Sequence, residues 1–268
     1  MKIPANNTEL FYDWKGNPDG PVIVFVNGLL TDTASWNAHL PFFTGKYRCL
    51  VWDCRGQGQS DKPDEVYDTK LHTADLAVLV DKLGIEKAHF VGLSNGGAAV
   101  LEYAANHSDR VLSVVATGAY ASVDTILRVK LTSWISAMEC GGSPLRFDVA
   151  MPWVWGGGFL EKNYQAALLP FREKGVNMPI EWAMNLIKGA MVHDIREKLP
   201  LIAAPVLAIV GEEDVLTPPR LSSYISQKVQ DGRLKVMQGI GHAAALEDVE
   251  GWSRIVNDFL ESVERGEA

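Results

Sequence analysis

The strongest constraint on the fold is an alternation between short apolar runs and longer segments with helical periodicity. The apolar runs are rich in β-branched residues, as strands buried on both faces of a parallel sheet are. They lie at Thr8–Trp14, Val22–Val26, Tyr47–Trp52, Ala88–Leu93, Val111–Thr117, Pro205–Val210 and Leu234–Met237. The helical patterns lie at Ser35–Phe43, Leu71–Leu83, Ala98–Asn106, Arg220–Gln230 and Val249–Val263. This alternation predicts an α/β fold with a doubly wound, mostly parallel sheet.

One interval interrupts the alternation. Between the apolar run that ends at Thr117 and the one that begins at Pro205 lie roughly 80 residues, far more than an ordinary connection contains. Helical patterns recur within it, at Asp124–Glu139, Pro144–Val154, Leu160–Leu168 and Ile180–Val192. We therefore expect a core formed by residues 1–120 and 201–268, with a helical cap formed by residues 121–200 inserted between late strands.

Tryptophans are concentrated in this insertion. It contains four of the chain's eight, namely Trp134, Trp153, Trp155 and Trp182. Such a concentration predicts that the insertion closes an apolar cavity and that these rings contact a substrate. The alternative, that they only bind the insertion to the core, stays open at this stage.

The composition argues against several classes of partner. The formal net charge is −8 at pH 7 and the basic residues are scattered, which argues against nucleic acid or an anionic membrane surface as a partner. No run approaches the roughly 18 apolar residues of a membrane helix. Residues 1–10 lack the apolar region of a secretory signal, so a cytoplasmic location is expected. The three cysteines have no metal-type spacing and are expected to be reduced.

A nest of glycines surrounds Ser94. The pentapeptide Gly92-Leu93-Ser94-Asn95-Gly96 follows a predicted strand and precedes a predicted helix, which is the context of a nucleophile elbow. A nucleophile at so sharp a turn takes a strained backbone conformation, and side chains two residues before and after it would collide. Glycine is therefore expected at both places, and Ser94 is the predicted nucleophile.

Phosphate-binding loops fit these glycines less well. A P-loop needs a lysine after its second glycine, whereas Gly96 is followed by Gly97 and Ala98. A second glycine-rich stretch, RGQGQSD at Arg55–Asp61, has an aspartate where the third glycine of a dinucleotide fingerprint would fall. We therefore expect no bound nucleotide, and no metal site is predicted.

A serine nucleophile needs a base beside it and an acid that orients the base. The candidate base is His242, in the loop-like stretch GIGHAAALED, and the candidate acid is Asp214, in the stretch VGEEDVLTPP after a late strand. The order Ser94, Asp214, His242 is the order of an α/β-hydrolase triad. All three residues fall at the carboxyl ends of strands or just beyond them, the edge at which open α/β sheets bind ligands.

Other residues compete for these two roles. Glu212 and Glu213 neighbour Asp214, and Asp124 follows the strand that ends near Thr117. His107 is typical of a capping residue at the end of the helix after Ser94. The remaining histidines are expected on the surface or satisfied in the core: His39, His72, His89 and His193.

With these motifs the chain resembles the α/β-hydrolase superfamily over nearly its whole length. The stretch DCRGQGQSD at Asp53–Asp61 is similar to a structural turn of the family, Asp-x-Arg-Gly-x-Gly-x-Ser. Most members have His-Gly before the oxyanion residue, whereas this chain has Asn27-Gly28. This asparagine, and the run Asn27–Trp36 as a whole, resembles the 3-oxoadipate enol-lactonase and carboxylesterase branch. That branch commonly has methionine in place of Asn95.

The resemblance implies a cofactor-free serine hydrolase that acts on a small-molecule ester, lactone or similar acyl compound. In this architecture the backbone amides of Leu29 and Asn95 hold the oxyanion. We also expect Asn27 to contact substrate, together with the four tryptophans of the insertion. Four cations of the insertion could meet a substrate carboxylate or could simply be solvated: Arg128, Lys130, Arg146 and Arg172.

Several other functions remain compatible with the same residues. Cleavage of a C–C bond, thioester hydrolysis and perhydrolysis would all use the same triad. A ligand receptor that keeps the triad without turnover is the non-enzymatic alternative. The oligomeric state is not predicted.

Overall fold

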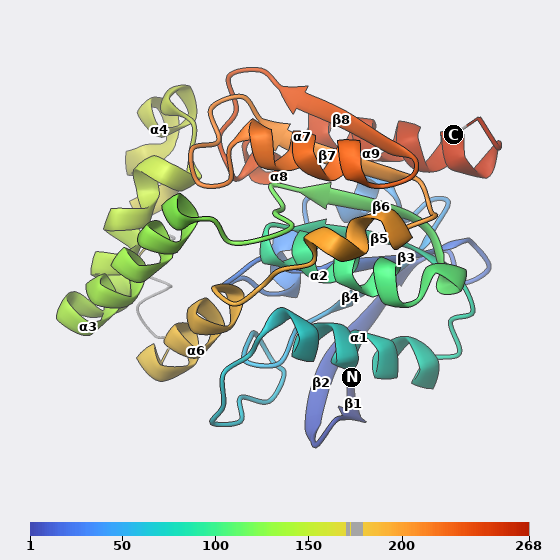
Figure 1. Cartoon of the computed structure of the whole chain (residues 1–268), viewed down its shortest axis with the longest axis horizontal. Coiled ribbons are helices and arrows are strands. Elements are labelled where there is room, and N and C mark those ends of the chain that lie inside the picture. Colours follow the sequence, from blue (N-terminus) through green and yellow to red (C-terminus); the bar gives the residue numbers. More distant parts are fainter. Residues whose placement is uncertain (170–171, 173–178, 268) are drawn as a thin grey trace.

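The computed structural model describes residues 1–169, 172 and 179–267. Within these residues eight strands form one sheet in the order β1-β2-β4-β3-β5-β6-β7-β8 (Figure 1). Strands β3 to β8 are parallel, and β2 and β1 extend one edge in antiparallel pairing. The strands are β1 Lys2–Ala5, β2 Thr8–Gly16, β3 Val22–Val26, β4 Arg48–Trp52, β5 Ala88–Leu93, β6 Val111–Thr117, β7 Val206–Gly211 and β8 Gly232–Met237. The predicted fold class is confirmed.

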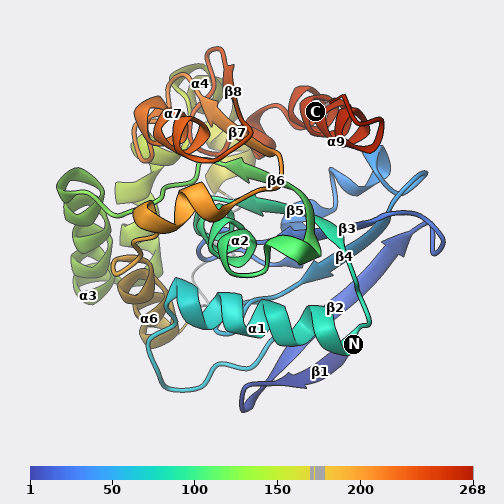
Figure 2. The same cartoon turned by 45° about the vertical axis from the view of Figure 1, so that its right-hand side comes forward.

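Helices cover both faces of this sheet. The α-helices of the core are α1 Thr69–Lys82, α2 Asn95–Asn106, α7 Pro219–Lys228, α8 Ala244–Glu247 and α9 Val249–Glu264. Short 3₁₀ segments are η1 Thr33–Trp36, η2 Leu40–Phe42, η3 Ser108–Arg110 and η5 Arg196–Leu201. Figure 2 shows α1 and α2 on one side of the sheet and α9 on the other.

The alternation of side chains along each strand explains these two layers. In β3, Val24 and Val26 pack in the cluster that contains the buried residues of α1 and α2. Their neighbours Ile23 and Phe25 pack in the other cluster, with Trp252 of α9. Consecutive strand residues point to opposite faces of a sheet, so a run that is apolar throughout is buried on both sides.

The hairpin of β1 and β2 was not predicted in full. Strand β1 contains Pro4, which suits an edge strand because proline cannot donate to a sheet ladder. The two residues between the strands, Asn6 and Asn7, both have positive φ, at 45° and 61°. Two such residues form the tight turn that hairpins favour, so the Asn-Asn pair was the available signal.

The predicted helix Ser35–Phe43 is instead two 3₁₀ segments, η1 and η2. Pro41 lies at the start of η2, where a continuing α-helix would need a backbone N–H. Trp36 and Phe43 are nevertheless fully buried, so the apolar periodicity correctly predicted which residues enter the core.

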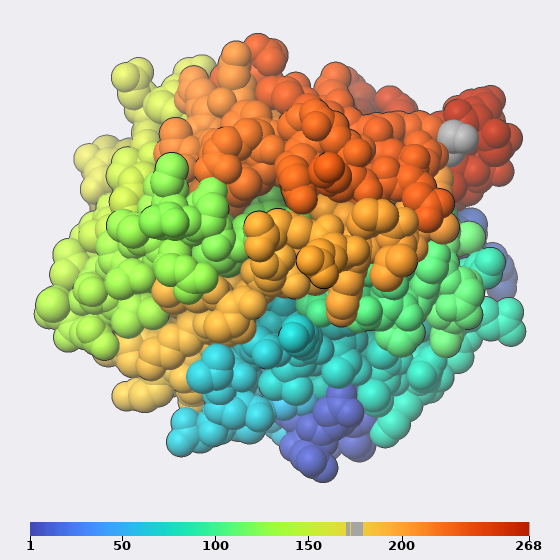
Figure 3. All heavy atoms as spheres, in the orientation of Figure 1, coloured from blue at the N-terminus to red at the C-terminus, as the bar shows by residue number. Residues whose placement is uncertain are grey.

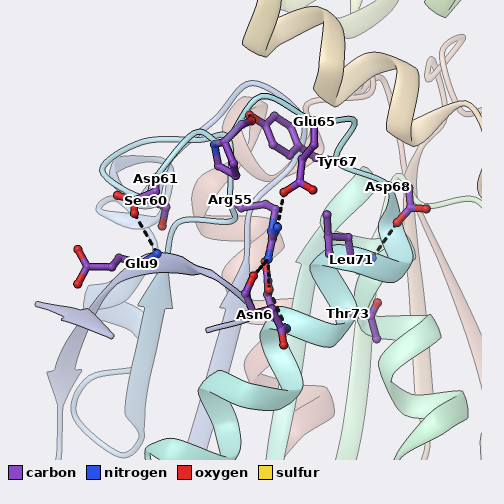
Figure 4. A network of polar contacts seen from close by, with 12 residues as sticks. Asn6, Glu9, Arg55, Ser60, Asp61, Glu65, Tyr67, Asp68, Leu71 and Thr73 are labelled. Atoms are coloured by element: carbon purple, nitrogen blue, oxygen red, sulfur yellow. Dashed lines mark hydrogen bonds and ion pairs between the residues drawn. The ribbon is translucent and has the colours of Figure 1, made fainter. Parts of the chain in front are cut away.

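A buried ion pair holds the loop after β4 against α1, as Figure 4 shows. Arg55 donates to both carboxylate oxygens of Asp75, at 2.6 and 2.7 Å, and to the backbone oxygen of Asn6 at 3.1 Å. Its second side-chain partner is the carboxylate of Glu65. The arginine of the stretch DCRGQGQSD therefore has a structural role, because it connects this loop to α1 and to the β1–β2 turn.

Helices lie at one end of the sheet in the described part of residues 121–190, within the predicted cap. They are α3 Thr125–Val154, α4 Gly157–Asn163, the π-helix η4 Tyr164–Leu168 and α6 Ile180–Ala190. The backbone of α3 is broken at Gly142, with φ 67° and ψ −165°, and Pro144 then begins its second half. The break lies between the two predicted helices Asp124–Glu139 and Pro144–Val154. In Figure 3 the green and yellow-green atoms of the insertion adjoin the orange atoms of the C-terminal core.

Candidate active site

Ser94 stands at the turn between β5 and α2. Its backbone has φ 52° and ψ −117°, a conformation that non-glycine residues rarely adopt. The N–H of Ser94 donates to the backbone oxygen of Thr117 at 2.7 Å, which fixes the turn to the neighbouring strand β6. Strain of this kind persists only where the surrounding structure holds it, and it is common at functional sites.

The two glycines around Ser94 are required by close backbone contacts. A Cβ atom on Gly92 would collide with the backbone of Gly96 and Gly97. A Cβ atom on Gly96 would collide with the backbone oxygens of Val26 and Asn27. Each collision involves backbone, which cannot move aside, so the physical reason given for glycine at both positions holds in the structure.

The structure brings Ser94, His242 and Asp214 together from three separate loops. The Nε2 atom of His242 lies 3.0 Å from Oγ of Ser94, and its Nδ1 atom lies 2.8 Å from Oδ2 of Asp214. The carboxylate of Asp214 is fully buried. A buried carboxylate that accepts from Nδ1–H leaves Nε2 unprotonated and facing the serine, as a general base requires.

Thr217 is a fourth member of this arrangement that sequence reasoning missed. Its backbone N–H donates to Oδ1 of Asp214 at 2.8 Å. Its hydroxyl lies 2.9 Å from Oδ2 of Asp214, 2.9 Å from Nδ1 of His242 and 2.8 Å from the backbone oxygen of Gly118. The signal was its place three residues after an aspartate, where a turn returns the backbone N–H to the carboxylate.

Gly118 supports the imidazole from behind. Its φ is 58°, and a Cβ atom there would lie 3.0 Å from Cε1 of His242. The ring therefore rests against backbone, and a side chain at this position would displace it.

The competing carboxylates all have other partners. Glu212 accepts from the backbone N–H of Gly239, and Glu213 accepts from that of Gly157. Asp124 caps the first turn of α3 and forms an ion pair with Arg220. Asp214 is thus the acid that the fold places against His242.

The competing histidines lie away from Ser94. Four of them are buried, and burial lowers the pKa of each to about 4: His39, His72, His89 and His193. Such rings are neutral members of the core at pH 7. His107 follows α2 and stacks on Tyr103, with 4.7 Å between ring centroids.

The predicted oxyanion donors flank the serine. Asn95 is the first residue of α2, and backbone amides in a first helical turn have no partner within the helix. Its side chain is held by the hydroxyl of Tyr120, which donates to Oδ1 at 2.9 Å. Leu29 lies in the loop after β3 and lines the cavity beside Ser94. Their role as oxyanion donors stays a prediction.

The expectation that Asn27 contacts substrate is wrong. Asn27 is buried, and its Oδ1 accepts from the indole N–H of Trp36 at 2.7 Å. Its Nδ2 donates to the backbone oxygen of Trp52 at 3.1 Å and to Asp53 at 3.3 Å. The amide is therefore engaged within the protein, and Asn27 is not among the residues that line the cavity.

The loop after β3 is held by further side-chain contacts. The backbone N–H of Leu30, a residue with φ 62°, donates to Oε1 of the buried Gln57 at 2.9 Å. That of Thr33 donates to Asp53 at 2.7 Å. Burial raises the pKa of Asp53, and its hydrogen bonds oppose the rise. Together with Asn27, these contacts give the backbone around Leu29 one conformation.

A cavity of about 170 Å³ lies beside Ser94 and His242. Much of its wall comes from α3 and is apolar. Trp134 and Trp155 line it, and their contact with substrate stays a prediction, whereas Trp153 and Trp182 do not line it. Trp153 stacks on Trp134 with 6.4 Å between centroids, and Trp182 lies under the ammonium of Lys62. For these two rings the expected substrate contact is therefore corrected, since each packs against other parts of the protein.

The described residues contain neither a cluster of metal ligands nor a membrane-spanning helix. No group of three or more His, Cys, Asp or Glu side chains among them is placed to hold a metal ion. In the same ranges, no helix combines the length and apolarity that crossing a membrane demands.

Comparison with known proteins places this architecture among hydrolases. A family model described as alpha/beta hydrolase fold matches residues 21–138. The chain is similar to the 3-oxoadipate enol-lactonase 1 of Acinetobacter baylyi, at 28% identity over 93% of this chain and 92% of that protein. It is also similar to the putative carbamate hydrolase RutD of Stutzerimonas stutzeri, at 26% identity over 91% and 92%. The solved enol-lactonase of Burkholderia xenovorans superimposes with a TM-score of 0.90, at 26% identity over 97% and 100%.

Proposed function

Because this chain is an α/β-hydrolase-fold protein, we propose that it is a serine hydrolase that cleaves a carboxylic ester or lactone through an acyl-enzyme intermediate. Ser94 is the nucleophile, His242 the general base and Asp214 the residue that orients the base. The observation that supports this most is the continuous hydrogen-bonded chain from Ser94 through His242 to the buried Asp214 at the wall of an apolar cavity.

The first half of the reaction forms the acyl enzyme. His242 accepts the hydroxyl proton of Ser94 at Nε2 while Oγ attacks the carbonyl carbon. The imidazolium that forms is stabilised by Asp214, whose other oxygen is held by the backbone N–H of Thr217. The amides of Leu29 and Asn95 donate to the negative oxygen of the tetrahedral intermediate. As this intermediate collapses, Nε2 returns the proton to the leaving alcohol.

The second half releases the acid. A water molecule gives its proton to His242 and attacks the acyl carbon, and the same amides stabilise the second tetrahedral intermediate. Collapse returns the proton to Oγ of Ser94. Water is the one co-reactant that this scheme uses, and Ser94 and His242 are regenerated at its end. The proposed reaction therefore requires no cofactor.

The cavity favours a small acyl compound. Its volume is about 170 Å³, and a buried apolar cavity of roughly 150 Å³ accepts a benzene molecule. The helical cap proposed for residues 121–200 supplies much of the wall. The proposed substrate is therefore a short ester or a small lactone, which accords with the lactonase name of one relative.

Hydrolysis of p-nitrophenyl acetate and butyrate by wild type and Ser94→Ala tests the proposal. Loss of a triad nucleophile costs up to about 10⁶ in turnover, so Ser94→Ala should retain no measurable activity above background. Retention of most of the activity would exclude this mechanism. A panel of short esters, lactones, thioesters and β-diketones, with peracid formation as a further readout, then ranks ester or lactone cleavage against the other reactions of the same triad. Absence of turnover on every acyl compound, with tight ligand-dependent binding of a partner, would favour the receptor.

A further inference from the structure

Arg146 lines the cavity that also contains Ser94 and His242. It lies in the second half of α3, after the break at Gly142, and the residues of this half that share the wall with it are apolar, among them Phe147 and Met151. A charged guanidinium is unexpected on this apolar wall, because a charge among apolar side chains is unfavourable unless it is paired.

Arg146 has no anionic partner in the described part of the chain. Its buried Nε donates no hydrogen bond there, and no ion pair between described residues includes it. Its guanidinium lies over the ring of Trp134, with 5.9 Å between Cζ and the ring centroid.

The other three cations that the sequence offered for a substrate carboxylate differ from Arg146. Arg172 forms an ion pair with Asp148 at 2.7 Å, and Lys130 donates to the backbone oxygen of Val215. Arg128 is exposed on the first half of α3 and does not line the cavity. Of the four cations that the sequence alone could not distinguish, Arg146 lines the cavity and the other three do not.

Arg146 is half-buried on the apolar wall, and a cation in such a place without a counter-ion is unfavourable. Burial lowers the pKa of Arg146 to about 10, which still leaves it charged at pH 7. Desolvation of such a charge is repaid only when an anion with suitable geometry approaches it. Its planar fork of donors matches a carboxylate, which can accept two parallel hydrogen bonds.

We propose that Arg146 binds a carboxylate carried by the substrate at the end remote from the bond that is cleaved. The proposal rests on the serine hydrolase function and names its substrate class: short esters or lactones with a second, anionic group. A net charge of −8 gives the protein no general attraction for anions, so this preference has to come from a local cation. The small volume of the cavity lets one short molecule lie against both Ser94 and Arg146.

Two esters of nearly the same shape, of which only one carries a carboxylate, measure the contribution of the substrate's negative charge. Monomethyl succinate carries a carboxylate where methyl levulinate carries a methyl ketone, and methanol release measures hydrolysis of both. A charge-assisted hydrogen bond discriminates by about 10- to 100-fold, so wild type should prefer monomethyl succinate by that factor in kcat/KM. Equal rates on the two esters would overturn the proposal.

Three variants assign the preference to one residue. Arg146→Met keeps the aliphatic length without the charge, and it should lower the preference at least tenfold through a higher KM for monomethyl succinate. Arg146→Lys keeps a charge and should retain part of the preference. Arg128→Met removes the same charge from an exposed position of the same helix, and it should keep the wild-type preference. An equal loss in Arg128→Met, or none in Arg146→Met, would contradict the assignment.

Binding separates this proposal from the proposed function. Calorimetric titration of monomethyl succinate into Ser94→Ala should give a complex, which Arg146→Met in the same background weakens about tenfold. This result would support the anion site even if neither ester were hydrolysed. Conversely, hydrolysis of methyl levulinate that depends on Ser94, with no effect of Arg146→Met on rate or affinity for monomethyl succinate, would leave the hydrolase proposal intact and remove the anion site alone.

Discussion

The loops at the carboxyl edge of the sheet and the helices of the insertion form two sides of one cavity, but they are built in opposite ways. In the loops, polar groups satisfy one another: Asp214 accepts from Thr217 and His242, and Asp53 accepts from Thr33 and Asn27. Among the residues that the structure describes, the insertion instead presents apolar side chains and a cation, Arg146, that forms no ion pair. A polar network in which every group has a hydrogen-bond partner holds one geometry, which catalysis requires. A charged group without a partner is instead available to bind a ligand of opposite charge.

The two regions are joined directly beside His242. The backbone N–H of Ala243 donates to the oxygen of Val154, at the end of α3, at 2.9 Å. Glu247 accepts from the N–H of Gly156 at 3.1 Å, and burial raises the pKa of Glu247. The wall of the cavity is therefore held in a fixed position next to the base. We expect substitutions in the loops to change the rate for every substrate, and substitutions in the insertion to change the choice between substrates.

The largest expected effect of this kind comes from Asp214. Asp214→Asn should lower kcat by about 10⁴, because an amide can hold the imidazole in the wrong tautomer. Asp124→Asn is the matched control, since Asp124 caps α3 and pairs with Arg220 away from His242. Steady-state hydrolysis of p-nitrophenyl acetate measures both. A larger loss in Asp124→Asn would show that the acid had been misassigned.

Acid should weaken the core through its neutral histidines. Burial lowers the pKa of His39 from 6.5 to about 4, so the unfolded chain binds more protons than the folded one between these values. Stability is then fully present above pH 6.5 and is lost as the pH falls toward 4, by up to about 3 kcal/mol for one such residue. Urea unfolding between pH 7 and 4.5 measures the slope. His39→Gln should flatten it by about one proton, and identical slopes for wild type and His39→Gln would refute the assignment.

Gln57 offers a test of the network behind the oxyanion loop. Gln57→Leu leaves the N–H of Leu30 without its acceptor and frees the backbone next to Leu29. Complete removal of one oxyanion donor costs about 10²- to 10³-fold, so a displaced donor should cost about 10-fold in kcat, with little change in KM. Affinity for a boronic acid that mimics the tetrahedral intermediate should fall in parallel. A rise in KM alone would indicate that the loop contacts the ground-state substrate instead.

The sequence alone predicts features whose requirements are local in the chain, and it does not predict contacts that form only in the folded molecule. Ser94 and its glycines could be predicted because the requirements of the turn involve five consecutive residues. The fold class could be predicted from the alternation of apolar runs and helical patterns. The role of Asn27 was not readable, because its partners Trp36 and Trp52 meet it only in the folded sheet. Arg146 could not be separated from its neighbours for a related reason: the pairing of a cation depends on the direction a helix takes after a break.

The smallest expected effect tests the tryptophans of the insertion against each other. Trp155 lines the cavity, whereas Trp153 stacks on Trp134 behind the wall. Trp155→Ala should therefore change the ratio of kcat/KM for p-nitrophenyl butyrate and acetate several-fold, because loss of one ring removes part of the roughly 10-fold discrimination that an apolar pocket gives to a methylene. Trp153→Ala should change stability more than this ratio. If Trp155→Ala lowers the rates for both esters equally, Trp155 contributes to the rate of the reaction and not to the choice of substrate. The division between rate-setting loops and substrate-selecting helices would then be wrong for this residue.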